Sequence, residues 1–193
     1  DQAPQRVTSP PTHRPRRAAR PWPLRLLAVL LIVAPAALPA AEPPSTVAAA
    51  AADAAPLVLH DGARYVGRLK DGLLDGAGRL QWDDGRSYEG HFRRGRMDGQ
   101  GRYVGNGHVY AGAFVAGAMQ GRGKLTREDG SVYEGEFMQG RMDGFGKLSF
   151  GGGYAYEGRF SRSKPSGLGR LVEPSGLTID GRFDGSYEPV GDA

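Results

Sequence analysis

Cysteine is absent from the 193 residues of this chain. Its absence excludes disulfide bonds, thiolate catalysis, cysteine-ligated zinc and a lipid-modified cysteine after a signal peptide. Most of the chain also has no excess of charge of one sign. Six of the 25 Lys and Arg and one of the 21 Asp and Glu precede residue 42, which leaves 19 basic and 20 acidic residues from Glu42 on. Such a balanced body argues against broad electrostatic binding, and we expect no nucleic-acid partner.

A long uninterrupted hydrophobic run is missing as well. The longest apolar stretch, Leu26 to Ala41, has 16 residues and contains Pro35 and Pro39, whereas a membrane-spanning helix needs about 20. A basic segment precedes this stretch and small residues end it, which is typical of a secretory signal peptide. Residues 1–41 are therefore predicted to be a signal peptide, with an uncleaved N-terminal membrane anchor as the alternative. Either way we expect an exported protein, periplasmic or secreted, or anchored to the membrane by this segment.

The rest of the chain divides into three parts by composition. Residues 42–60 begin with an Ala/Pro-rich segment that has too little apolar bulk to fold, and we expect a disordered linker there. A repeat array follows over residues 61–185, and a C-terminal tail covers residues 186–193.

Glycine is abundant, with 31 residues, and it recurs in register with aromatic residues. Tyrosine is followed by Gly two positions later, by Phe or Leu four positions later, and then by a Gly-x-Gly. This unit recurs every 22 or 23 residues, and self-similarity at such a period indicates a repeat array. Five full repeats begin at Tyr65, Tyr88, Tyr110, Tyr133 and Tyr156, and a partial sixth begins at Ile179.

The spacing within a repeat predicts β-strands. Residues at i, i+2 and i+4 project to one face of a strand, and each Gly in a helix interior would cost about 1 kcal/mol. Asp84-Gly85, Asn106-Gly107 and Asp129-Gly130 stand between one repeat and the next, where they predict two-residue hairpin turns. We therefore expect an all-β fold, in which hairpin repeats form a single-layer antiparallel sheet.

The repeat resembles the MORN (membrane occupation and recognition nexus) motif, Tyr-x-Gly-x-Phe-x-x-Gly-x-x-x-Gly-x-Gly. Tyr88 to Gly101 and Tyr133 to Gly146 match it throughout. Leu69 replaces Phe in the first repeat, Ser163 replaces the mid-motif Gly in the fifth, and Ile179 replaces Tyr in the sixth. The resemblance implies an elongated array of hairpins and a role in recognition or at membranes.

One face of the predicted sheet is aromatic, and it has two interpretations. The rings pack between neighbouring repeats, with Gly making room for each ring, or they line a groove that binds a segment of another protein. The candidate residues of this predicted aromatic groove are Tyr65, Trp82, Tyr88, Phe92, Tyr103, Tyr110, Phe114, Tyr133, Phe137, Phe150, Tyr156 and Phe160.

The opposite face carries a basic residue after each Gly-x-Gly. This predicted basic ladder consists of Arg79, Arg102, Lys124, Lys147 and Arg170. One interpretation is a surface for anionic lipid head groups, at about 1 kcal/mol for each charge near the membrane. The other, which we favour, is cross-strand pairing with Glu89, Glu134 and Glu157 on the same face.

Residues suited to catalysis are scattered. His60, His91 and His108 share neither metal-ligand spacing nor a repeat position. Asp75, Asp98 and Asp143 recur before Gly, where short polar residues favour turns. Met97, Met119 and Met142 are expected to pack the same loops onto the sheet.

We expect no catalytic activity, cofactor or metal. The sequence predicts a module for protein interaction or scaffolding, with anionic-lipid binding or self-association through the terminal strands as alternatives.

Overall fold

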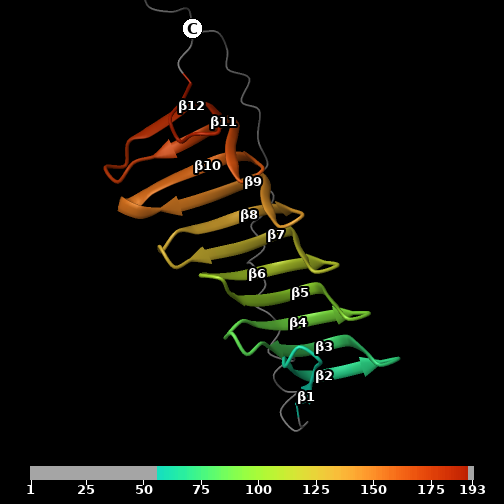
Figure 1. The fold of residues 1–193 in the computed structure, drawn as a ribbon. Helices are drawn as coiled ribbons and strands as arrows, with labels where there is room; N and C mark the ends of the chain where they lie inside the picture. Colours follow the sequence, from blue (N-terminus) through green and yellow to red (C-terminus); the bar gives the residue numbers. More distant parts are fainter. Residues whose placement is uncertain (1–55, 191–193) are drawn as a thin grey trace, which may run out of the picture. The chain divides into compact units, whose positions relative to one another are not determined.

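The computed structural model describes residues 56–190, which form one antiparallel sheet. Its twelve strands lie side by side in chain order (Figure 1). They are β1 (Leu57–Val58), β2 (Arg64–Lys70), β3 (Leu73–Gln81), β4 (Ser87–Arg93), β5 (Arg96–Gly105), β6 (His108–Val115), β7 (Ala118–Arg127), β8 (Val132–Met138), β9 (Arg141–Phe150), β10 (Tyr154–Ser161), β11 (Lys164–Val172) and β12 (Thr178–Asp184). A single 3-10 turn, η1 (Gly151–Gly153), connects β9 to β10. The predicted all-β, single-layer sheet of hairpin repeats is confirmed.

The ends of the array differ from the predicted boundaries. Strand β1 lies inside the predicted linker 42–60, because Leu57 pairs with Tyr65 and Val58 with Arg64. At the other end, part of the predicted tail 186–193 packs on the sheet, as described below. The predicted signal peptide or anchor, residues 1–41, and most of the linker lie outside the described residues. Between residues 56 and 190, no helix has the length and apolar character needed to cross a bilayer.

Strand register places the repeated aromatic residues on one face. In each hairpin the repeated Tyr pairs with an apolar residue of the following strand, as Tyr88 does with Tyr103 and Tyr133 with Leu148. Because directly opposed residues share a face, the repeated Tyr and Gly lie together with the Phe of the second to fifth repeats. We call this the Tyr face. A β-bulge shifts the register at the same point of each repeat, as between Gly90 and Phe92.

The turns between repeats are of two kinds. Asn106-Gly107 is a two-residue turn as predicted, with positive φ angles of 52° and 74° at its two residues. It connects the second and third repeats, whose tyrosines Tyr88 and Tyr110 are 22 residues apart instead of 23. The prediction is wrong for Asp84-Gly85, where the Trp82 N–H donates to the Arg86 carbonyl at 2.9 Å and closes a three-residue loop.

Asp129-Gly130 likewise ends a three-residue loop, because the Arg127 N–H donates to the Ser131 carbonyl at 2.9 Å. Within this loop the Asp129 carboxylate accepts a 2.8 Å hydrogen bond from the Ser131 N–H, and Gly130 alone has a positive φ angle, 79°. The Asp-Gly pair therefore provides the single left-handed residue of a three-residue turn, not both residues of a two-residue one.

From the second hairpin on, the turn inside each hairpin docks on the preceding repeat. At Arg94-Gly95, the Gly95 N–H donates to the Leu74 carbonyl at 2.9 Å, and the Arg94 N–H donates to Asp75 Oδ2 at 3.3 Å. The next three hairpins repeat this arrangement, with side-chain acceptors Asp98, Gln120 and Asp143. Asp75, Asp98 and Asp143 lie in strands and bridge successive repeats, so the expectation that they form turns is wrong.

Replacing one bridging carboxylate tests this contact. We expect Asp143→Ala to lower the free energy of unfolding by about 1 kcal/mol, since the Arg162 N–H, now 3.1 Å from Asp143 Oδ2, loses its partner. Urea unfolding followed by circular dichroism measures the change. Asp184→Ala, at an exposed position at the end of β12, is the control. Equal stabilities of the two variants would contradict the proposed role of Asp143.

Candidate functional site

The repeated tyrosines lie flat against glycine pairs. An added Cβ at Gly90 would lie 2.5 Å from Tyr88 Oη, and only 2.6 Å from the Cα of Gly101. The ring of Tyr88 therefore fills the space that two side chains would otherwise need. Its hydroxyl donates to the His91 carbonyl at 3.0 Å. The four other repeated tyrosines bond in the same way to the carbonyl three residues on, at 2.9–3.3 Å.

The tyrosines alternate with phenylalanines in a continuous row of edge-to-face rings. Phe114, for example, contacts Tyr110 of its own repeat and Tyr88 of the preceding one, both with ring centroids 5.1 Å apart. The row runs from Tyr65 to Phe183 with centroid distances of 4.9–5.3 Å. Each such pair contributes about 0.5–1.5 kcal/mol beyond its buried area, so this row joins the repeats into one core.

Nine of the twelve residues of the predicted aromatic groove belong to this core. They are buried, with at most 4% of their surface exposed: Tyr65, Tyr88, Phe92, Tyr110, Phe114, Tyr133, Phe137, Tyr156 and Phe160. Trp82, Tyr103 and Phe150 are partly exposed and pack against the core. Packing between repeats thus describes the nine, and these three are the candidate rings that keep part of their surface exposed.

Burial also changes how the core tyrosines titrate. Desolvation raises the pKa of Tyr110 to about 12, from the ordinary value of 10. The unfolded chain therefore loses this phenolic proton at a lower pH than the folded chain does. The stability that this group contributes is complete below pH 10 and is lost as the pH rises toward about 12. In a pH titration from 10 to about 12, we expect the tyrosinate absorbance to increase as the β-strand signal in circular dichroism decreases. Core tyrosines that ionise near pH 10 while the chain stays folded would contradict this expectation.

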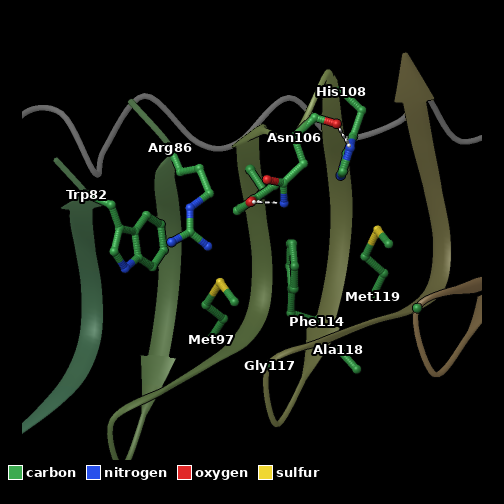
Figure 2. A pocket seen from close by; sticks show the side chains of 11 residues that line it. Trp82, Arg86, Met97, Asn106, His108, Phe114, Gly117, Ala118 and Met119 are labelled. Carbon is green, nitrogen blue, oxygen red and sulfur yellow. Dashed lines mark hydrogen bonds between the residues drawn. The ribbon is translucent and has the colours of Figure 1, made fainter. Parts of the chain in front are cut away.

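An open pocket of about 310 Å³ lies on the Tyr face and extends from Trp82 of the first repeat to Gly140 of the fourth. Figure 2 shows Trp82 and Arg86 at one end, Met119 at the other, and Met97 and Phe114 between them. Most of its lining is apolar, which suits a pocket for an apolar or aromatic group.

Trp82 and Tyr103 form the aromatic end of the open pocket. Their rings meet edge to face with centroids 6.4 Å apart, and the Arg86 guanidinium lies 5.1 Å from the Trp82 ring. Asn106 donates to the Tyr103 hydroxyl at 3.0 Å, and the His108 ring lies 5.6 Å from the Tyr103 ring. These contacts hold the rings in place before any partner arrives, which lowers the entropy cost of binding.

The open pocket arises where the sequence departs from the repeat. Tyr103 occupies the position at which the other full repeats carry leucine, Leu80, Leu125, Leu148 or Leu171. The shorter Asn106-Gly107 turn pairs Gly105 with His108 and so brings His108 beside Tyr103. Sequence reasoning missed Arg86 and gave His108 no role. The signal for His108 was the one-residue shortening at Asn106-Gly107, whereas Arg86 lies in the loop of the first repeat, which has the usual length.

A second part of the Tyr face is covered by the chain itself. The segment Ser186–Val190, which we call the tail segment, packs over the last repeats. The Tyr187 ring lies 4.9 Å from Phe150 and 5.8 Å from Tyr156, between centroids. The Val190 N–H donates to the Arg182 carbonyl at 2.7 Å. Burial raises the pKa of Tyr187. This contact was not predicted, since the tail lies outside the repeat.

The predicted basic ladder lies on the opposite face, with all five residues exposed. Except at Ala111, acidic residues stand between them in the strand register, so that charges alternate across the rest of the sheet. The row reads Arg79, Glu89, Arg102, Ala111, Lys124, Glu134, Lys147, Glu157, Arg170 and Asp180. Lys124 pairs with Glu134 at 2.7 Å and Arg170 with Asp180 at 2.6 Å. This geometry supports cross-strand pairing, and exposed pairs of this kind contribute little to stability because solvent screens them.

Groups suited to catalysis do not come together in the described part of the chain. Within residues 56–190, no three His, Asp or Glu side chains form a cluster that could hold a metal ion. His91 bonds to the Gln100 carbonyl at 3.4 Å and His108 to the Asn106 carbonyl at 3.1 Å, so each contacts its own hairpin or turn.

A single-layer sheet of hairpins, joined by one row of core rings, defines a tandem β-repeat protein. Residues 65–85, 88–108, 110–132, 133–153 and 156–178 each match the MORN repeat. The chain belongs to the MORN repeat family. Repeats of this family generally mediate protein or membrane-lipid interactions and are generally not catalytic.

Two further comparisons complete these findings. No curated protein matches the chain. Among solved structures, it is similar to the SAS-4 (dCPAP) TCP domain in complex with a proline-rich motif of Ana2 (dSTIL) of Drosophila melanogaster. The identity is 14% and the TM-score 0.29, over 86% of this chain and 96% of that one.

Proposed function

We propose that this protein is a non-catalytic module that binds a segment of another protein in the open pocket on its Tyr face. The observation that carries the proposal is the partly exposed pair of Trp82 and Tyr103 beside a pocket of about 310 Å³. Aromatic rings held rigidly by their neighbours are the groups that most often dominate binding energy at protein interfaces.

The basic segment and short apolar stretch within residues 1–41 support export, so the partner belongs to the cell envelope or the extracellular space. Export is tested by fusing the full chain to alkaline phosphatase, which is active only after translocation. An inactive fusion would place the module in the cytoplasm and would remove this part of the proposal.

The experiment for binding is capture of partners by the full chain from cell-envelope extract, compared between variants. Tyr103→Ala removes an aromatic wall of the open pocket, whereas Leu168→Ala changes a side chain that is 76% exposed and points to the opposite face. We expect a partner that the wild type and Leu168→Ala retain and Tyr103→Ala loses, with unchanged circular dichroism. A partner that all three proteins retain would move the binding site away from the open pocket.

Binding of anionic lipid head groups is the second candidate, and one feature favours it. Ala111 interrupts the alternation of charges, so Arg102 and Lys124 flank a position without an acid. Lipid binding through these residues weakens as salt rises, because exposed charges are screened within about 8 Å at physiological ionic strength. Salt-dependent pelleting on phosphatidylserine vesicles that Ala111→Glu abolishes would favour this candidate.

A further inference from the structure

The outer edge of β12 ends the sheet on its C-terminal side. In the strand order β12 has a neighbouring strand on one side only, β11. Ile179 stands here at the position of the repeated Tyr, so the sixth unit has no tyrosine ring to lie on Gly181. A strand edge carries unpaired N–H and C=O groups that pair readily with another strand. The edge of β12 is therefore a place where this sheet can be extended.

The tail segment occupies part of this edge. The Val190 N–H donates to the Arg182 carbonyl at 2.7 Å, and the two residues form an isolated antiparallel bridge. Pro189 packs on Gly181, where an added Cβ would lie 2.9 Å from the Pro189 Cβ. Tyr187 holds the segment in place, because its ring packs on the Tyr face. One tail residue thus takes the place that a further strand of the sheet would fill.

Every pair of neighbouring strands from β2 to β12 is aligned on two opposed glycines. Gly78 opposes Gly90, for example, and Gly169 opposes Gly181. Beside the pair of Gly78 and Gly90, Arg79 opposes Glu89. An extension of the sheet beyond β12 in the same register would place another glycine opposite Gly181.

The sequence of β12 is complementary to itself in this register. When β12 of two copies pair antiparallel about Gly181, Asp180 of each copy opposes Arg182 of the other, and Ile179 opposes Phe183. The first pairing joins opposite charges on the face of the basic ladder, and the second joins two apolar residues on the Tyr face. The pairing has twofold symmetry, so both copies use the same surface.

Charge also favours a second copy at this edge. Each acid of the alternating row stands between two basic residues of neighbouring strands, except Asp180, which has only Arg170 beside it. Arg182 is exposed and forms no ion pair within residues 56–190. Arg182 of a second copy would give Asp180 its second basic neighbour. Such exposed pairs add little stability, but they fix the register and select the partner.

We propose that the outer edge of β12 is an interface for a second copy of this chain, and that the tail segment masks it. The interface forms when the tail segment leaves the edge, because β12 of the second copy then takes the place of Val190. The open pocket lies between Trp82 and Gly140, so the interface is independent of the proposed function. The joined sheets keep their Tyr faces on the same side, and a dimer therefore carries two open pockets on one continuous face.

The test compares the full-length wild type with a tail-release variant, which combines Tyr187→Ala with Val190→Pro. This variant lacks the ring contact and the N–H that binds the Arg182 carbonyl. Sedimentation velocity over a range of concentrations gives the mass of each protein. We expect the wild type to stay monomeric and the tail-release variant to dimerise, with unchanged circular dichroism. A tail-release variant that stays monomeric at every concentration would overturn the proposal, and a wild type that already dimerises would overturn the masking by the tail segment.

Charge variants of the tail-release variant locate the interface. Arg182→Asp and Asp180→Arg each place like charges opposite each other in a homodimer, so we expect each of them to be monomeric. Mixed in equal amounts, the two restore both ion pairs, and we expect a heterodimer that salt weakens. Gln100→Asp, at an exposed position of the inner strand β5, is the control and should leave the homodimer intact.

Two results would overturn this interface. A homodimer that survives Arg182→Asp would place the contact between copies on another surface. Assemblies that grow beyond a dimer would join β12 of one copy to the opposite end of the next, because such a head-to-tail contact does not close.

Discussion

Gly90→Ala is expected to lower the free energy of unfolding by about 3 kcal/mol, the upper end of the usual cost of overpacking a core. The new methyl group would lie 2.6 Å from the Cα of Gly101 and 2.7 Å from the Gln100 carbonyl oxygen. Both are backbone atoms of the paired strand β5, so no side-chain rotation relieves the overlap. Either β4 and β5 move apart, or the Tyr88 ring is displaced from its position against Gly90 and Gly101.

Gly151→Ala is the matched control for this prediction. An added Cβ at Gly151 meets no atom within 4 Å, so this substitution is expected to change stability by less than about 0.5 kcal/mol. Thermal or urea unfolding of both variants measures the difference. A Gly90→Ala protein as stable as Gly151→Ala would mean that the glycine pairs are not required for close packing under the tyrosine rings.

Tyr110→Ala is expected to lower the free energy of unfolding by about 4 kcal/mol, as removal of a large buried ring does. Tyr110 is fully buried, and its ring contacts Phe114 and Phe137 at 5.1 and 5.0 Å between centroids. Its loss opens a cavity in the middle of the row and breaks the ring contact between repeats three and four. Tyr110→Phe keeps the ring and loses only the 3.0 Å hydrogen bond to the Ala113 carbonyl, a cost of about 1 kcal/mol.

Tyr103→Ala provides the contrast, because Tyr103 is only partly buried and lies beside this row instead of within it. We expect a markedly smaller loss of stability for Tyr103→Ala than for Tyr110→Ala. Circular dichroism during urea unfolding ranks the three variants. If Tyr103→Ala were as unstable as Tyr110→Ala, its effect on partner binding would reflect unfolding, and the open pocket would lose its clearest test.

The period of the sequence was sufficient to predict the sheet. Tyr, Gly and Phe two residues apart determine which face each strand buries, and the same spacing in five repeats determines the hairpin order. The identity of the core followed as well, since a ring on every repeat must pack either against its neighbours or against a partner. What periodicity cannot provide is the length of each connecting loop. Asp-Gly suits both a two-residue and a three-residue turn, and the number of residues on either side decides between them.

The candidate site was harder to predict because it depends on departures from the period. Tyr103 is conspicuous only when compared with the leucines of the other repeats, and Arg86 acquires its contact with Trp82 from the shape of a loop. The tail segment carries no repeat signal at all. Tyr187 finds its place because Phe150 and Tyr156 leave an aromatic surface beside the last strands, a consequence of tertiary packing that no local pattern contains.

The docking of each hairpin turn on the preceding repeat gives the array a direction. Turn N–H groups of a later repeat reach back to carbonyl and carboxylate oxygens of the earlier one, as Gly117 does to the Met97 carbonyl at 2.8 Å. A hairpin leaving the ribosome therefore meets its acceptors already in place, because domains and repeats fold from the N-terminal end during synthesis. The sheet therefore grows from its N-terminal end. In a nascent chain that stops after any repeat, the last turn already has its hydrogen-bond acceptors on the repeat before it.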